Sequence, residues 1–174
     1  MKKLNEPNIQ KVEEKRPYVS IPIEVTLKEW NKATALVGKV LAWTAKKKVD
    51  IAGAPFFKYR VIGDMDRKFS IEVGVPVSNV VEGDGRVIAG FIPAGSYVSL
   101  VHDGHPDQIR ASHQAVEDWA NQQGLEWDIS KDKDEKEVWG GRFEFYLSNP
   151  VEQPDPNKWS TLLQYRLHEK CYMV

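Results

Sequence analysis

The sequence shows the same order of elements twice (strand, helix, strand, strand), and this repetition constrains the fold more than any other feature. In the first copy, β-branched residues that roughly alternate over 18–25 predict a strand. Apolar residues at spacings of three and four over 27–47 then predict an amphipathic helix. Strand-like runs at 56–62 and 69–77, joined by a turn, complete the copy as a hairpin.

The second copy repeats this order further along the chain. A strand is expected within 87–102, and a helix from Pro106 to about Gly124, because proline suits the first turn of a helix and glycine the residue after its end. The last strands are expected at 141–149 and 160–167. The tripeptide YVS stands near the start of both copies, and a tryptophan follows inside each helix. These observations predict an α+β fold built from a duplicated β-α-β-β unit.

Composition limits the classes of protein that this chain can form. The 174 residues suffice for one well-filled domain, and the formal net charge of -1 provides no basic field for nucleic acid or an anionic membrane. The single cysteine, Cys171, cannot form an internal disulfide, which indicates a cytoplasmic protein. The N-terminus has no apolar signal-peptide region, and no stretch approaches 18 uncharged apolar residues, so no membrane segment is expected.

Three polar segments are expected to lie outside the regular structure. Residues 1–16 are charged and without period, which is typical of a flexible leader. Residues 130–137 are expected to form an exposed charged loop, and residues 169–174 are expected to form a C-terminal tail.

Five motifs in order resemble the GyrI-like domains, which also serve as effector-binding domains of some AraC-type and multidrug-responsive transcription regulators. The motifs are GAPFFKY (53–59), IEVGVPV (71–77), IPAGSYVSLVHDGHPDQI (92–109), DWANQQGLEWD (118–128) and FEFYLSNP (143–150).

The resemblance covers about 17–168, with one half at about 17–79 and the other at about 87–168. It implies pseudo-twofold symmetry, an antiparallel sheet with two helices on one face, and a ligand cleft between the halves. It also implies a buried glutamate, which in such domains often contacts cationic or polar groups of hydrophobic ligands. The turn around His105 departs from the family pattern, which has a tyrosine there. The short polar segment upstream has no helix-turn-helix, so no direct DNA binding is expected.

Glu144 is the first candidate for a functional residue, because it lies within the aromatic run RFEFY. Alternation along a strand places Glu144 and Tyr146 on one face, and Phe143 and Phe145 on the other. The phenylalanines are expected to face the helices, with Glu144 on the concave side. Two interpretations remain open: an exposed carboxylate paired with Arg142, or a pocket residue, which the resemblance favours.

A partly desolvated carboxylate takes up a proton or attracts a cation, and aromatic walls add cation–π attraction for a flat ligand. The other expected ligand-binding residues are Tyr146, Tyr59, Phe57, Trp139, Tyr97, Tyr18 and His105. Core packing is the alternative for Trp139 and for at least one of the pair Tyr18 and Tyr97, and capping a helix is the alternative for His105.

No metal or cofactor is expected. His102, Asp103, His105 and His113 are close in sequence, but no cysteine or further carboxylate completes a tetrahedral zinc site. Phosphate-binding loops, dinucleotide turns and nucleophile elbows are absent.

The leading hypothesis is a stand-alone protein that binds or sequesters a small molecule that is hydrophobic and can also be cationic. The first alternative is a hydrolase of strained electrophilic toxins of the cyclopropane type, with Glu144 and Tyr146 or Tyr59 as catalytic residues. A gyrase-interacting, antitoxin-like protein is the second alternative. The sequence does not distinguish binding from catalysis, and it does not specify an oligomeric state.

Overall fold

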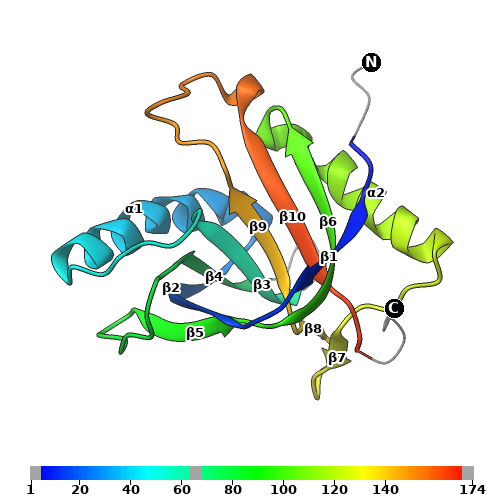
Figure 1. Ribbon diagram of the computed structural model, residues 1–174, viewed down its shortest axis with the longest axis horizontal. Coiled ribbons are helices and arrows are strands. Elements are labelled where there is room, and N and C mark those ends of the chain that lie inside the picture. The colour runs from blue at the N-terminus through cyan, green and yellow to red at the C-terminus, as the bar shows by residue number, and fades with distance from the viewer. Residues whose placement is uncertain (1–4, 63–67, 170–174) are drawn as a thin grey trace.

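The computed structural model describes residues 5–62 and 68–169 (Figure 1). Within them, two α-helices and three short 3₁₀ helices accompany ten strands. The helices are η1 (Leu27–Glu29), α1 (Trp30–Lys46), η2 (Pro106–Gln108), α2 (Ile109–Gln122) and η3 (Pro156–Lys158). The strands are β1 (Asn8–Val12), β2 (Arg16–Val25), β3 (Phe56–Ile62), β4 (Phe69–Pro76), β5 (Ile88–Ile92), β6 (Gly95–Asp103), β7 (Ile129–Lys131), β8 (Glu137–Trp139), β9 (Arg142–Tyr146) and β10 (Ser160–Arg166).

The predicted α+β class and the predicted duplication are confirmed by the order of the strands. All pairings are antiparallel, and the main path runs β1-β6-β10-β9-β3-β4-β2-β5. Counted inward from its two ends, this order matches β6 with β2, β10 with β4 and β9 with β3, which are the equivalent strands of the two copies. A pseudo-twofold axis therefore passes between β9 and β3. Three residue pairs join β3 to β9, and the middle one places Phe57 opposite Glu144. The glutamate of interest therefore lies next to the pseudo-twofold axis.

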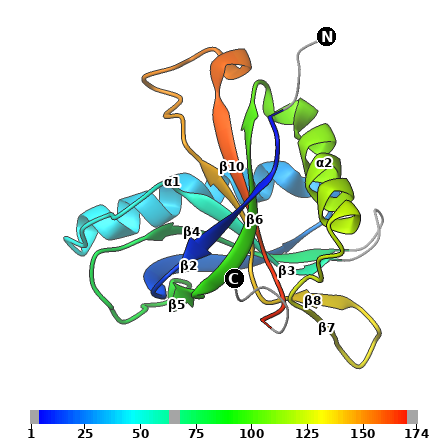
Figure 2. The same cartoon turned by 45° about the vertical axis from the view of Figure 1, so that its right-hand side comes forward.

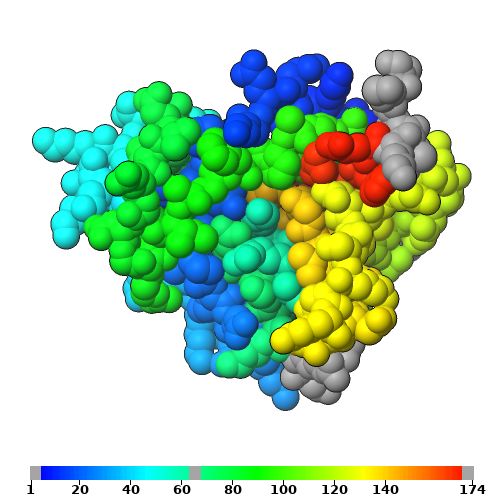
Figure 3. Space-filling model, turned by 90° about the horizontal axis from the view of Figure 1, so that it is seen from below, coloured from blue at the N-terminus to red at the C-terminus, as the bar shows by residue number. Residues whose placement is uncertain are grey.

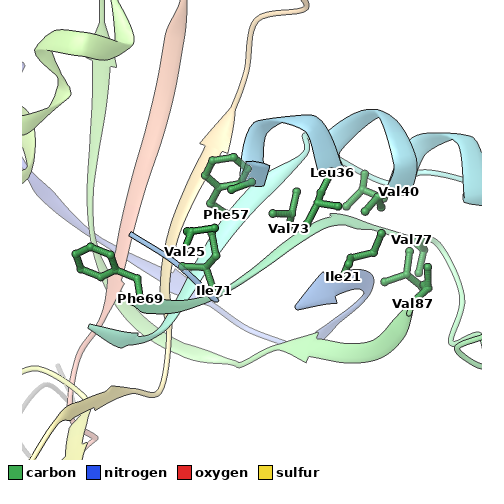
Figure 4. Packing of buried hydrophobic residues seen from close by; sticks show 13 residues of the cluster. Ile21, Val25, Leu36, Val40, Phe57, Phe69, Ile71, Val73, Val77 and Val87 are labelled. Atoms are coloured by element: carbon green, nitrogen blue, oxygen red, sulfur yellow. The ribbon is translucent and has the colours of Figure 1, made fainter. Parts of the chain in front are cut away.

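The sheet is curled, and its two faces carry different cores. On the helix face, Leu36 and Val40 of α1 pack on strand residues such as Ile21 and Val73 (Figure 4). The opposite face carries an aromatic cluster made of Tyr18, Phe56, Tyr97, Phe143 and Phe145, together with Ile92.

The expected orientation of β9 was therefore wrong. Phe143 and Phe145 face away from the helices, whereas Tyr146 packs in the cluster under α1 and Glu144 points toward α2. Both faces of β9 are buried, so the alternation of its side chains does not by itself show which face meets the helices.

Two segments that were expected to be irregular are strands. Residues 8–12 were assigned to a loose leader, but they form β1 and pair with β6 (Figure 2). Residues 130–137 were assigned to an open loop, but β7 and β8 form a hairpin that pairs with β3. In the space-filling view, the yellow segment that contains this hairpin lies beside the teal segment that contains β3 (Figure 3). Most side chains of both segments are exposed, so their backbones pair without an apolar period that a sequence could show. In the hairpin turn, the Asp132 carboxylate accepts backbone hydrogen bonds from Asp134 and Lys136 at 2.9 and 3.0 Å.

Candidate functional site

Glu144 lies at the centre of a buried hydrogen-bond cluster on the helix face of the sheet. Its side chain is 4% exposed although it is a carboxylate. The Tyr59 hydroxyl donates to Oε2 at 2.5 Å, and His113 Nε2 lies 3.1 Å from the same oxygen. The Tyr146 hydroxyl donates to Oε1 over a longer distance of 3.2 Å. The carboxylate is thus hydrogen-bonded at both oxygens, but more weakly at Oε1.

The residues of the cluster come from both halves of the fold. Antiparallel pairing of β3 with β9 brings Tyr59 beside Glu144, and α2 presents His113 from above the sheet. Alternation along β9 places Tyr146 on the face of Glu144, as predicted. No single segment of sequence contains this site.

Aromatic rings form one side of the cluster. Phe57, directly opposite Glu144 across the strand pair, contacts Tyr146 edge to face with ring centroids 5.1 Å apart. Trp30, the first residue of α1, contacts Phe57 at 5.5 Å and stacks on Tyr59 at 6.1 Å. These rings provide apolar surface beside a negative charge.

The cluster keeps Glu144 ionised. Burial by itself raises the pKa of Glu144, but the hydrogen bond and charge of His113, the hydrogen bond from Tyr59 and the charge of Arg142 together hold it below its ordinary value. Burial, followed by the negative charge of Glu144, raises the pKa of Tyr59 and that of Tyr146 well above their ordinary values. At neutral pH the site is therefore a carboxylate surrounded by protonated hydroxyl donors.

Arg142 supplies a second charge on the same face. Its guanidinium carbon lies 4.3 Å from the ring centroid of Tyr165, 4.7 Å from that of Trp139 and 5.2 Å from that of Tyr59. Among the described residues, Arg142 forms no ion pair with Glu144, and cation–π contacts hold it instead. Trp139 thus reaches the cluster through Arg142 and through Tyr165, whose ring centroid lies 5.4 Å from that of Trp139.

His113 is a member of the cluster that sequence reasoning missed as a ligand-binding candidate. Its Nε2 faces Glu144 and its Nδ1 forms a short hydrogen bond with the Tyr165 hydroxyl. The sequence did indicate the direction that His113 faces, because it stands four residues after Ile109 and three before Val116, at the edge of the apolar stripe of α2. Trp30 was also missed, since it was assigned to the core.

Three predicted residues lie away from Glu144. Tyr18 and Tyr97 belong to the aromatic cluster on the opposite face, where their hydroxyls donate to Glu72 at 2.9 Å and to the Pro93 carbonyl at 2.7 Å. The His105 ring caps the start of η2 by accepting from the backbone of Asp107 at 3.1 Å. The structure therefore brings Glu144, Tyr146, Tyr59 and Phe57 together and separates the other candidates from them.

The side chains of the cluster close over the carboxylate, and a surface hollow lies away from it. That hollow has a volume of about 760 Å³ and lies on the outer surface beside Lys15, Phe91 and Arg166. A ligand that reaches Glu144 must therefore displace partly exposed side chains such as Tyr59, Tyr146 and His113.

Within residues 5–62 and 68–169, no group of three or more His, Cys, Asp or Glu side chains could hold a metal ion. His102, which was considered as a metal ligand, is buried and bonded to Ser112 Oγ at 2.7 Å and to the His105 carbonyl at 3.0 Å. In the same part of the chain, neither helix is long and apolar enough to cross a membrane.

The chain thus forms a duplicated α+β domain with a buried polar cluster beside its pseudo-twofold axis. The chain belongs to the family of GyrI-like small molecule binding domains, whose family model matches residues 6–168. No curated protein sequence matched the chain.

Solved structures show the same fold at low sequence identity. The C-terminal domain of EcmrR is 16% identical with a TM-score of 0.74, and the alignment covers 96% of this chain and 99% of that domain. The chain spans 58% of the length of the EcmrR chain in its complex with DNA. A hydrolase from Listeria innocua is 13% identical with a TM-score of 0.59, covering 95% of this chain and 93% of that protein. SAV2435, solved bound to tetraphenylphosphonium, is 14% identical with a TM-score of 0.56, covering 94% of both chains.

Proposed function

We propose that this domain binds, and so sequesters or senses, a hydrophobic ligand that carries a positive charge, with the Glu144 carboxylate as the counter-ion. The observation that carries the proposal is an ionised, buried carboxylate without a Lys or Arg ion pair among the described residues. A buried charge is costly unless a partner of opposite sign compensates for it. A ligand cation would supply that compensation.

The surroundings of Glu144 suit a ligand with apolar surface. Trp30, Phe57, Tyr59 and Tyr146 present ring faces and edges within one cluster. Aromatic rings attract cations and tolerate flat ligands of different shapes. The structure of SAV2435 with tetraphenylphosphonium, a hydrophobic cation, is consistent with this class of ligand in a similar fold.

Binding of tetraphenylphosphonium compared with triphenylphosphine oxide, a neutral molecule with similar rings, tests the proposal. We expect the cation to bind at least about tenfold more tightly to the wild-type domain, because only the cation compensates the carboxylate. Isothermal titration calorimetry at constant ionic strength provides both affinities. Equal affinity for the two molecules, or no binding of either, would contradict the proposal.

Hydrolysis of a strained electrophile is the second candidate function. The observation in its favour is the 2.5 Å hydrogen bond between Tyr59 and Glu144, since a tyrosine can polarise a carbonyl while a carboxylate orients water. The lowered pKa of Glu144 argues against it as a general base, because an efficient base has a pKa near the working pH. Turnover of a cyclopropane-fused dienone by the wild type, lost in Glu144→Gln, would support catalysis over binding alone.

A further inference from the structure

We propose that His113 is the resident counter-ion of Glu144, and that a ligand cation competes with the proton on this imidazole, so that binding releases a proton. This inference rests on the proposed function, because it specifies how the same carboxylate exchanges one cation for another. It makes His113 the residue that determines how strongly the site holds a cation at a given pH.

The hydrogen bonds define which nitrogen of His113 keeps its proton. An ionised carboxylate only accepts, so the Nε2 that lies 3.1 Å from Glu144 Oε2 must carry a hydrogen. The other nitrogen, Nδ1, faces the Tyr165 hydroxyl. A hydroxyl can donate to a neutral imidazole or accept from an imidazolium. The ring of His113 therefore keeps the same partners in both protonation states and can gain or lose a proton without leaving its place.

Charges of both signs lie around His113. From α2, Arg110 lies one turn before His113 and Glu117 one turn after it, and from β9 come the carboxylate of Glu144 and the guanidinium of Arg142. Burial raises the pKa of the Tyr165 hydroxyl, Arg142 opposes this, and the charges of Glu117 and Glu144 add to it, so these charges act on one small region.

The uncharged neighbours do not alter this balance. Tyr59 from β3, Tyr146 from β9 and Tyr165 from β10 stay protonated, since burial raises the pKa of each. The contact from α1 is the neutral ring of Trp30, which stacks on Tyr59. Glu144 is thus the carboxylate that pairs directly with His113, and either a proton on that ring or a ligand cation can neutralise it.

The consequence is competition between two cations for one carboxylate. Imidazole exchanges its proton in the range around pH 5 to 8. Loss of that proton removes the competing cation while Glu144 remains ionised, so we expect the affinity for a permanently charged ligand to rise with pH. Full coupling to one proton corresponds to about tenfold in Kd for each pH unit.

The experiment uses tetraphenylphosphonium as the probe, because its charge does not depend on pH. Titrations at pH 6 and pH 8 at equal ionic strength should show about tenfold tighter binding at pH 8. Calorimetry near pH 6.5 in two buffers with different ionisation enthalpies should count a release of roughly half to one proton per ligand bound. His113→Gln keeps an N–H donor for Glu144 but cannot carry a charge, so its affinity should change less than about twofold between the two pH values.

His105→Gln is the matched control, because His105 caps η2 and has no contact with Glu144 among the described residues. This variant should keep the pH dependence of the wild type. Wild-type affinity that is equal at pH 6 and pH 8 with no proton released would overturn the inference, and so would a pH dependence that persists in His113→Gln. If that variant does not fold, the proton count of the wild type decides alone. Failure of the wild type to bind the probe at either pH would instead overturn the proposed function.

Discussion

Two buried glutamates, one in each half of the domain, show how similar side chains can have different roles. Glu72 on β4 and Glu144 on β9 are both 4% exposed, but they lie on opposite faces of the sheet. Glu72 Oε1 accepts hydrogen bonds from Ser20 Oγ at 2.7 Å and from the Tyr18 hydroxyl at 2.9 Å. In number of hydroxyl donors, the two carboxylates are equivalent.

Their charge partners differ. Glu72 Oε2 lies 3.6 Å from Arg60 Nε and 3.8 Å from Lys58 Nζ, so two permanent cations of the chain compensate it. Burial, with a smaller contribution from Arg60, lowers the pKa of Lys58, and the charge of Glu72 opposes this effect. Glu144 has only the titratable His113 as an ion-pair partner within the described residues. The Glu72 charge is thus matched by basic side chains of the fold, whereas the partner of Glu144 is an imidazole, whose place we propose a ligand cation can take.

The largest effect on stability should come from Glu72→Gln. Removal of this charge leaves Lys58 buried without its carboxylate, which should lower the free energy of unfolding by about 3 kcal/mol. Glu144→Gln should cost only about 1 kcal/mol, because His113 can release its proton and the amide oxygen can still accept hydrogen bonds. Urea denaturation of both variants at pH 7 measures the difference. A larger loss for Glu144→Gln would break the distinction between the two sites.

The hydrogen bonds of Glu144 should rank by their lengths. Tyr59→Phe removes the 2.5 Å bond to an ionised acceptor and should lower the free energy of unfolding by about 2 kcal/mol. Tyr146→Phe removes the 3.2 Å bond and should cost less than about 1 kcal/mol. The same denaturation measurement distinguishes them, and the reverse order would show that Tyr146 is the main support of the carboxylate.

The smallest effect concerns the response to acid. Because the pKa of Glu144 is lower in the folded protein than in the unfolded chain, its ionisation contributes stability above the ordinary glutamate pKa. That contribution is lost as the pH falls through the folded pKa. The free energy of unfolding should therefore fall less steeply below about pH 5 in Glu144→Gln than in the wild type. Equal slopes would mean that folding does not lower the pKa of Glu144.

Much of the fold was predictable because its signals are local. The strand and helix order followed from periodicity. Thr26 and Glu29 form a capping box at the start of η1, in which the Thr26 N–H donates to Glu29 Oε1 at 3.2 Å. Gly124 follows the end of α2 with a φ of 69°, the left-handed conformation that favours glycine there. The edge strand β1 could not be found in this way, because its exposed polar side chains carry no period.

The site was less predictable because its contacts are long-range. Alternation showed that Glu144 and Tyr146 share a face, but both faces of this sheet are buried, so periodicity could not show which face meets the helices. The bond between Tyr59 and Glu144 depends on the register of β3 against β9, residues that are far apart in the chain. His113 was missed because its place at the edge of the helix stripe indicates which side of α2 it faces but not which residue it contacts.

The most direct test of the account is the affinity for tetraphenylphosphonium at pH 8 of the wild type, Glu144→Gln and Glu72→Gln. We expect Glu144→Gln to bind about 30-fold or more weakly, the equivalent of about 2 kcal/mol, because the counter-ion of the ligand is lost. Glu72→Gln, once shown to be folded, should bind within about twofold of the wild type, since its charge is matched on the other face of the sheet. Equal affinity of the wild type and Glu144→Gln, or a larger loss in Glu72→Gln, would contradict the claim that Glu144 is the exchangeable charge of this domain.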